Sequence, residues 1–90
     1  MATTTVSVQK RLGLRLGELR RRKELTQEVL AEKVGMLTPN YARIEQGRMN
    51  VTLDTLTRLA NALGVDVVEL FKAPTTKKSP RPGRPKKAAG

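Results

Sequence analysis

LTQEVLAEKVGMLTPNYARIEQG, residues 25–47, is the most informative segment of the sequence for the fold. It contains two short runs with apolar residues at helical spacing, and Gly35 separates them. Thr26 is typical of an N-cap that begins the first run, and Gly35 of a residue that ends it. Thr38 is expected to cap the second run, with Pro39 in its first turn, where the missing N–H costs no hydrogen bond. The stretch therefore predicts two short helices joined by a tight turn.

Such a pair has the spacing of a helix-turn-helix, in which the two axes cross at about 90–120°. The turn needs a residue that tolerates left-handed φ, which Gly35 provides, and the crossing needs a small residue, which Ala31 provides. The apolar residues expected to lock the pair together are Val34, Met36, Tyr41 and Ile44. In this arrangement the second helix, residues 38–46, stands out from the body with its N-terminal end free to enter a major groove.

The flanking segments predict three further helices. One is expected over residues 8–23, although Gly13 and Gly17 each weaken it by about 1 kcal/mol relative to alanine, so packing must hold it. Another is expected to follow the N-cap Thr52, and a last short helix to cover residues 67–72. The apolar residues expected on the inner faces are Val8, Leu12, Leu16, Leu19, Leu53, Leu56, Leu59, Ala60 and Leu63. The sequence thus predicts an all-α domain of five helices.

The apolar pattern predicts one folded domain over residues 8–73, a flexible N-terminus over 1–7 and a disordered, Pro-rich basic tail over 74–90. Charge is divided unevenly. Residues 1–71 hold 11 Lys and Arg and all 8 acids, whereas residues 72–90 hold 7 basic residues and no acid. This favours a polyanionic partner, with nucleic acid first and an anionic membrane surface second. A tail that only confers solubility is the plainer alternative.

Composition argues against several other classes of protein. The 90 residues include no Cys and no His, so a disulfide framework and the usual zinc ligands are excluded, and neither a metal nor a cofactor is expected. No nucleophile with a neighbouring base and no Gly-rich phosphate loop can be identified, so an enzyme is not expected. No apolar run approaches the roughly 20 residues that cross a bilayer, so no membrane association through a spanning helix is expected.

Linked motifs stand at fixed spacings along most of the chain. They are LG at 12–13, LR at 19–20, LTQ at 25–27, LAEKVG at 30–35, RIEQGR at 43–48 and TLDTLTRLANALGV at 52–65. These residues resemble the Cro/repressor-type, or lambda-repressor-like (XRE), family of helix-turn-helix DNA-binding proteins, over about residues 10–71. The resemblance implies the five-helix lambda-repressor-like fold, with 38–46 as the recognition helix. The sequence departs from the family's pattern at Gly17, Leu37 and Val51, and the family often has a polar residue where Leu37 stands.

The resemblance also implies roles for individual residues. Base-edge contacts are expected from Thr38, Pro39, Asn40 and Arg43, and phosphate contacts from Gln27, Arg48, Asn50 and Thr52. Arg can bind O6 and N7 of guanine through two hydrogen bonds, and Asn can pair similarly with adenine. The alternatives are a cap at Thr38, a solvated charge at Arg43 and ordinary turn chemistry at Arg48, Asn50 and Thr52. Finally, the resemblance pairs Arg20 with Glu45 as an ion pair that ties the first helix to the third, with direct contact to DNA as the alternative.

The end of the domain carries more apolar residues than one short terminal helix needs for docking. Some are expected to face the core and the rest to form a homodimer interface, with candidates Val65, Val67, Val68, Leu70 and Phe71. Two-fold pairing would place the recognition helices about 34 Å apart, one turn of DNA, and so predicts a near-palindromic operator.

Within the tail, SPRPGRPKK at 79–87 resembles the AT-hook, a short basic peptide with a Gly-Arg-Pro core that lies in the minor groove of A·T-rich DNA. The residues expected to contact the minor groove are Arg81, Arg84, Lys86 and Lys87. Pro82 stands where the full motif has a second Arg, so a weaker grip is expected. The alternative is a disordered basic linker that acts only by counterion release.

Resemblance and charge together predict a bacterial or phage transcriptional regulator that binds specific double-stranded DNA sequences. A repressor is the expected kind of regulator. Its expected location is the cytoplasm, associated with the nucleoid. Two alternatives remain: an antitoxin-like module that binds a partner protein and represses its own operon, and a nucleoid-architectural DNA binder with weak site preference.

Overall fold

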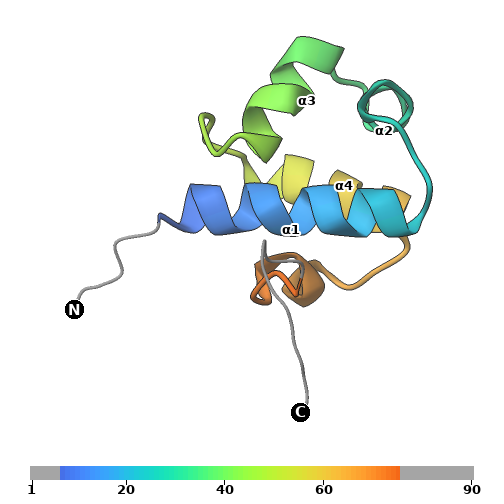
Figure 1. Ribbon diagram of the computed structural model, residues 1–90. Coiled ribbons are helices and arrows are strands. Elements are labelled where there is room, and N and C mark those ends of the chain that lie inside the picture. Colours follow the sequence, from blue (N-terminus) through green and yellow to red (C-terminus); the bar gives the residue numbers. More distant parts are fainter. Residues whose placement is uncertain (1–6, 76–90) are drawn as a thin grey trace.

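The computed structural model describes residues 7–75, which form five helical elements (Figure 1). They are α1 (Val8–Arg22), α2 (Gln27–Lys33), α3 (Thr38–Glu45), α4 (Leu53–Leu63) and the 3-10 helix η1 (Val67–Phe71). This part of the chain contains no strand, so the predicted all-α class is confirmed. The predicted count of five helices is not confirmed at the level of α-helices, because the described residues contain four α-helices and the last predicted helix is the 3-10 helix η1.

The segment that forms η1 has little to favour an α-helix. It is five residues long and begins with two β-branched valines, which have low helix propensity. Asp66 caps it by accepting a hydrogen bond from the backbone N–H of Val68 at 2.9 Å. The N–H of Glu69 donates to the carbonyl of Asp66 at 2.9 Å, which is an i→i+3 bond. Short segments of this kind readily close with the tighter 3-10 hydrogen bonds.

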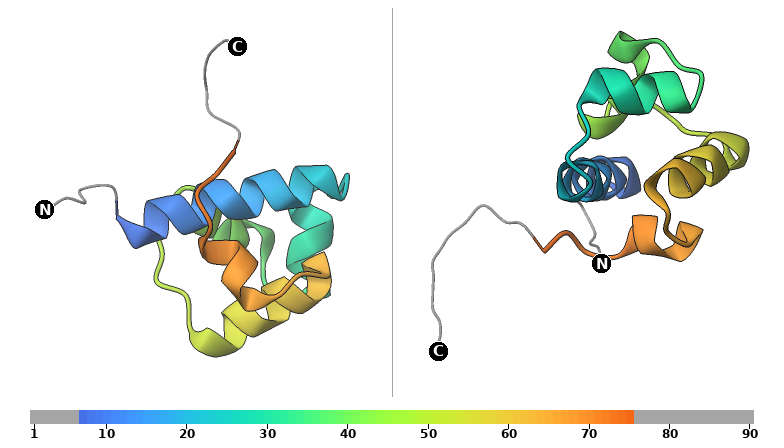
Figure 2. Two further views of the ribbon diagram at one scale, coloured as in Figure 1. Left: turned by 90° about the horizontal axis from the view of Figure 1, so that it is seen from below. Right: turned by 90° about the vertical axis from the view of Figure 1, so that its right-hand side faces the viewer.

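Helix α1 lies at the centre of the arrangement (Figures 1 and 2). Helices α2 and α3 lie on one side of it, η1 lies on the opposite side, and α4 runs behind it. Helix α1 packs against both α3 and η1, while α4 packs against α2 and η1. The two helices of the helix-turn-helix and the last helical segment are therefore on separate sides of α1.

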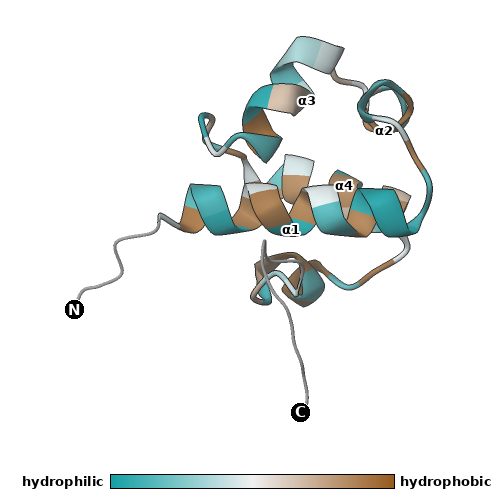
Figure 3. Cartoon of the chain, viewed as in Figure 1, coloured by the Kyte–Doolittle hydropathy of each residue, from teal (hydrophilic) through white to brown (hydrophobic). Residues whose placement is uncertain are grey.

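The core consists of aliphatic side chains and one tyrosine, contributed by all five elements. Its buried members are Leu12, Leu16, Leu19, Leu30, Ala31, Val34, Tyr41, Ile44, Leu56, Leu59, Ala60, Leu63 and Leu70. Teal and brown segments alternate along α1 in Figure 3, as expected of a helix with one apolar side. Two residues expected to point inward are exposed instead: Val8 and Leu53 are the first residues of α1 and α4, where each helix projects beyond the core.

Side-chain caps begin three of the α-helices. Ser7, Thr26 and Thr52 cap α1, α2 and α4, and each accepts a hydrogen bond from the backbone N–H three residues along, at 3.0–3.1 Å. The predicted caps at Thr26 and Thr52 are confirmed. Ser7 was assigned to the flexible N-terminus, but its side chain belongs to the folded domain as the N-cap of α1.

Helices α1 and α2 end in the same way, with the paired backbone bonds of a Schellman motif. This motif requires one residue with positive φ just beyond the helix. Gly35 fills that position after α2, with φ 74°, as the sequence predicted. After α1 the position is filled by Glu24, with φ 58°, although the left-handed conformation costs roughly 1–2 kcal/mol for a residue with a Cβ.

Gly13 and Gly17 allow the C-terminal end of α3 to lie directly on α1. A Cβ atom at position 13 would lie 2.5 Å from the carbonyl oxygens of both Ile44 and Glu45, which no alanine could tolerate without a backbone shift. A Cβ at position 17 would lie 3.3 Å from the Oε1 atom of Glu45. The packing that must hold this glycine-containing helix is thus provided by α3.

Candidate nucleic-acid interface

The helix-turn-helix consists of α2, α3 and the turn at residues 34–37. The backbone N–H of Met36 donates to the carbonyl of Ala31 at 2.9 Å, and the Ala31 side chain is fully buried where the helices approach. Helix α3 points its C-terminal end at α1, while its N-terminal end is farther from the body (Figure 1). The free end of α3 is therefore the end that carries the predicted base-contacting residues.

Helix α3 begins one residue earlier than the sequence predicted. Its N-cap is Leu37, whose carbonyl accepts the backbone N–H groups of Asn40 and Tyr41 at 3.0 and 3.1 Å. Thr38 is therefore the first helical residue and Pro39 the second, and the predicted cap at Thr38 is wrong. The Schellman turn at Gly35 sets the position at which α3 can begin. This geometry outweighs the preference of Thr38 for the N-cap position.

The outward side of α3 carries a polar pair. Arg43 Nη1 donates to Asn40 Oδ1 at 2.9 Å, one helical turn apart, while Tyr41 and Ile44 face the core. Pro39 and Arg43 are exposed, and Asn40 is half-buried. Residues three and four positions apart lie on one face of a helix, so these three side chains share one face. The structure thus brings three of the four predicted base-contacting residues together beside the free end of α3.

Glu45, at the last position of α3, joins three helices through one carboxylate. Arg20 on α1 donates to it through Nε at 2.7 Å and Nη2 at 3.3 Å, and both side chains are about nine-tenths buried. Gln27 Nε2 at the start of α2 donates to Oε1 at 2.9 Å, and the hydroxyl of Tyr41 also donates to the carboxylate. The predicted Arg20–Glu45 ion pair is present, and it forms the centre of a larger polar cluster.

The protonation of this cluster follows from its surroundings. Burial on its own raises the pKa of Glu45, but the hydrogen bonds that the carboxylate accepts outweigh this effect and hold the pKa below the ordinary value of 4.5. Burial, together with the hydrogen bond to Glu45, raises the pKa of the Tyr41 hydroxyl. The hydrogen bond to Glu45 likewise raises the pKa of Arg20. The carboxylate is thus ionised and the tyrosine protonated at neutral pH.

The predicted phosphate-contacting residues lie at helix starts and in the loop before α4. Gln27 begins α2 and is held by Glu45. Thr52 is the N-cap of α4, so the turn-chemistry alternative describes its side chain here. The Asn50 side chain accepts from Gln9 on α1, and Arg48 Nη1 donates to Gln46 Oε1 at 2.8 Å. All of these side chains have structural partners, and contact with phosphate remains a prediction.

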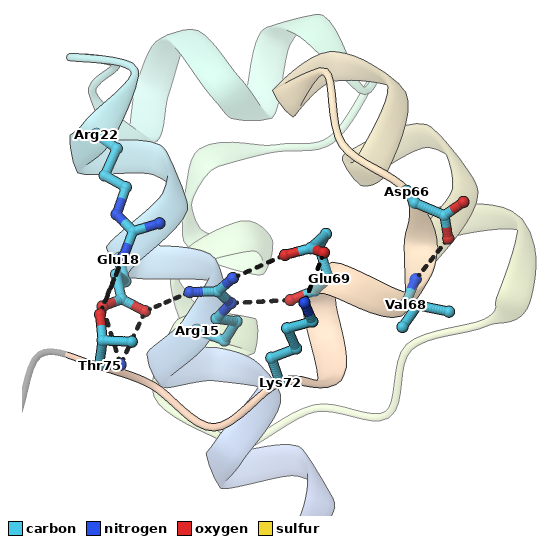
Figure 4. Close-up of polar contacts among 8 residues, drawn as sticks. All are labelled: Arg15, Glu18, Arg22, Asp66, Val68, Glu69, Lys72 and Thr75. Atoms are coloured by element: carbon cyan, nitrogen blue, oxygen red, sulfur yellow. Dashed lines mark hydrogen bonds and ion pairs between the residues drawn. The ribbon is translucent and has the colours of Figure 1, made fainter.

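A buried polar network on the opposite side of α1 was not predicted (Figure 4). Arg15 and Glu18 are only 4% and 3% exposed, and their side chains pair at 2.7 Å. Arg15 also binds Glu69 of η1, through the backbone carbonyl at 2.8 Å and the carboxylate at 3.1 Å. The backbone N–H and hydroxyl of Thr75 donate to Glu18. The network fixes η1 and the chain up to Thr75 against α1, so the folded part extends beyond the predicted boundary at residue 73.

Comparison with known families agrees with this geometry. Residues 11–71 match the model of a helix-turn-helix domain family, and this match spans more than half of the chain. The chain belongs to that helix-turn-helix family. The recognition, from residue patterns, of a Cro/repressor-type helix-turn-helix protein is thereby confirmed at the level of the domain.

Three similar proteins place this helix-turn-helix chain among regulators. The uncharacterized HTH-type transcriptional regulator y4dJ of Sinorhizobium fredii is 42% identical over 65 residues, which are 72% of this chain and 84% of that protein. The control protein C.MunI of a Mycoplasma species is 37% identical over 62 residues, 68% of this chain and 84% of that protein. The crystal structure of the restriction-modification controller protein C.AhdI from Aeromonas hydrophila has a TM-score of 0.68 and 40% identity, with 70% of this chain and 96% of that chain covered.

The predicted dimer residues of the helix-turn-helix protein divide into two groups. Val67, Val68 and Phe71 are 36%, 61% and 41% exposed. Leu70 is fully buried in the core, and Val65 is partly buried against it. The prediction of Leu70 as an interface residue is therefore wrong, because its side chain is fully buried where η1 packs against α1 and α4.

The remaining predictions concern the tail and other kinds of site. Arg81, Arg84, Lys86 and Lys87, which were expected to contact the minor groove, lie outside the described residues. Among residues 7–75, no cluster of three or more acidic side chains could hold a metal ion. The same residues include no helix of the length and apolar character that crossing a membrane requires.

Proposed function

We propose that this helix-turn-helix protein recognises one operator sequence in double-stranded DNA with α3 in the major groove. Its family and the regulators that it resembles make it a DNA-binding transcriptional regulator. The observation that supports sequence reading is the Asn40–Arg43 pair on the outward side of α3, next to its free N-terminal end. In a helix-turn-helix, the N-terminal residues of the second helix contact base edges.

The pair suits direct readout in its chemistry. Arg43 carries a guanidinium that can bind O6 and N7 of guanine, and Asn40 offers an amide that can bind N6 and N7 of adenine. Their mutual hydrogen bond at 2.9 Å orients both side chains along one face before DNA arrives. Binding then exchanges this bond for bonds to bases. Thr38 and Pro39 lie in the first turn of α3 and complete the proposed base-contacting set.

Phosphate contacts would set the orientation of the domain without reading sequence. Gln27 and Thr52 stand at the starts of α2 and α4, where backbone N–H groups and the helix dipole favour an anion. Arg48 and Asn50 are exposed in the loop between α3 and α4. We assign these four residues to the DNA backbone on the two sides of α3.

We further propose a homodimer on a near-palindromic operator. The supporting observation is the exposed apolar group Val67, Val68 and Phe71 of η1, the element on the side of α1 opposite the helix-turn-helix (Figure 1). Val8 is also exposed and lines a shallow hollow with Phe71, which extends the apolar surface onto α1. The basic tail, residues 74–90 with 6 Lys and Arg and no acid, is assigned to additional contacts with the DNA backbone or minor groove.

The test is selection of bound sequences from a random duplex pool, followed by affinity measurements on the preferred operator and on each single base-pair change. With the wild-type chain we expect one consensus. With Arg43→Ala we expect affinity to fall by about 1–3 kcal/mol and preference to relax at one base pair per half-site. Arg58→Ala is the matched control, because it removes another exposed arginine, from α4 outside the helix-turn-helix. Equal behaviour of the two variants on every sequence would refute the assignment of Arg43.

The selection experiment and two further observations separate the other candidate functions. Enrichment of no consensus at all, despite tight binding, would favour the nucleoid-architectural alternative. An antitoxin-like role predicts that a partner protein copurifies from the native host. Control of restriction-modification genes is a second specific candidate, because it is the named role of the similar C.AhdI protein. It predicts that the selected operator lies next to genes for a DNA methyltransferase or a restriction endonuclease.

A further inference from the structure

Leu37 breaks a local rule at the start of the recognition helix. Ser, Thr, Asp and Asn are favoured at the N-cap because their side chains accept a hydrogen bond from an otherwise unpaired N–H group, and leucine is among the poorest residues there. Three other α-helices of this chain have Ser or Thr at that position. Helix α3 has Leu37 and no side-chain cap bond. The departure from capping thus occurs at the one helix proposed to enter DNA.

The leucine gains nothing from packing in return. Its side chain is 71% exposed, whereas the preceding Met36 packs against the core. An exposed leucine at a position that calls for a polar residue contributes neither a cap nor burial. Positions where a sequence breaks a local rule without a structural gain are typical of functional sites.

The neighbours of Leu37 indicate what the side chain would meet. It directly precedes Thr38 and Pro39, on the free end of α3 that also carries the Asn40–Arg43 pair. In the major groove, the apolar feature that distinguishes one base from the others is the C5 methyl group of thymine. An aliphatic side chain next to it removes both apolar surfaces from water.

We infer that Leu37 determines specificity by contacting the C5 methyl group of a thymine in the operator. This inference rests on the proposed function, since it requires α3 to lie in the major groove. It adds an apolar readout at one base pair to the polar readout by Arg43 and Asn40. It also explains a leucine at this N-cap: in the bound state the methyl contact offsets the stability that a polar cap would contribute.

The experiment combines two protein variants with a change to single DNA atoms. Each thymine of the selected operator is replaced in turn by deoxyuridine, which removes only the methyl group. For the wild-type chain we expect one thymine per half-site at which this replacement weakens binding about fourfold, the value for one buried methyl-sized group. In Leu37→Ser and Leu37→Ala, the same replacement should leave affinity unchanged. Leu14→Ser, which removes an exposed leucine from α1, should keep the full fourfold effect.

The two variants also separate readout from folding. Leu37→Ser introduces a residue type that is favoured at an N-cap, so its melting temperature should be no lower than that of the wild type even though it loses the methyl preference. Leu37→Ala should lose the preference in the same way. A methyl effect that persists in both variants overturns the inference and assigns the contact to another residue, such as Pro39. An operator with no methyl-sensitive thymine overturns it while leaving the proposed function intact, whereas wild-type binding without any consensus overturns both.

Discussion

Replacing Glu45 by glutamine tests whether one carboxylate holds the helix-turn-helix on α1. The substitution keeps the shape but removes the charge that pairs with Arg20 at 2.7 Å, where the two side chains are only 13% and 10% exposed. Breaking a buried pair costs about 3–5 kcal/mol, because the remaining charge is left without its partner. Because both side chains keep some contact with water, we expect the lower end of this range, a loss of about 3 kcal/mol in the free energy of unfolding. A drop in melting temperature of roughly 12–24 °C should follow for a domain of this size.

The loss should also depend on pH with a definite sign. The pKa of Glu45 is lower in the folded chain than its ordinary value of 4.5. Its stabilising contribution is therefore fully present above pH 4.5 and is lost as the pH falls through the folded pKa. Urea unfolding of wild type and Glu45→Gln, followed by circular dichroism from pH 7 to pH 2, should give curves that converge at the acid end. Asp54→Asn is the control, since its pair with Arg58 is exposed and worth about 0–1 kcal/mol. A difference between wild type and Glu45→Gln that stays constant down to pH 2 would refute this account of the carboxylate.

Three other perturbations test the fold and the tail. Gly13→Ala should destabilise the domain by more than 2 kcal/mol, since its Cβ would meet two carbonyl oxygens at 2.5 Å; thermal melting measures this, and an unchanged melting temperature would contradict the close approach. Glu24→Gly should raise stability by up to about 1 kcal/mol, because it relieves a residue held at φ 58°; a fall in urea midpoint would contradict this. Deleting residues 76–90 should weaken DNA binding and flatten its dependence on salt while the preferred operator stays the same; unchanged affinity at low salt would exclude the tail from binding.

The elements that could be predicted from the sequence are those fixed by neighbouring residues. Thr26 and Gly35 specify the start and end of α2 through hydrogen bonds that span three to five positions, so local reading was sufficient. The start of α3 was missed because two local signals competed. Thr38 is the better N-cap by residue type, but after the turn at Gly35 the helix begins one residue earlier, with Leu37 as its N-cap.

The Arg15–Glu18 network could not be predicted for a different reason. A cation and an acid three positions apart on a helix are typical of a solvated surface pair. They become buried only because η1 and Thr75 cover them, and those residues lie more than 50 positions away in the sequence. The Arg20–Glu45 pair is just as non-local, and it was predicted solely through resemblance to a family. Side-chain pairs between segments that are distant in the sequence therefore cannot be predicted from local residue patterns in this chain.

The two polar clusters together explain how a helix with two glycines can organise the domain. On one side of α1, Gly13 and Gly17 admit α3, and Arg20 secures it through Glu45. On the other side, Arg15 and Glu18 hold η1 and the start of the tail. Because both attachments are made to the same rigid helix, the position of α3 relative to η1 is set within one chain. If two copies pair through the exposed surface of η1, the spacing between their recognition helices is then fixed by α1. Weakening the Arg15 cluster should consequently disturb the preferred half-site spacing of the operator before it disturbs the base preference within a half-site.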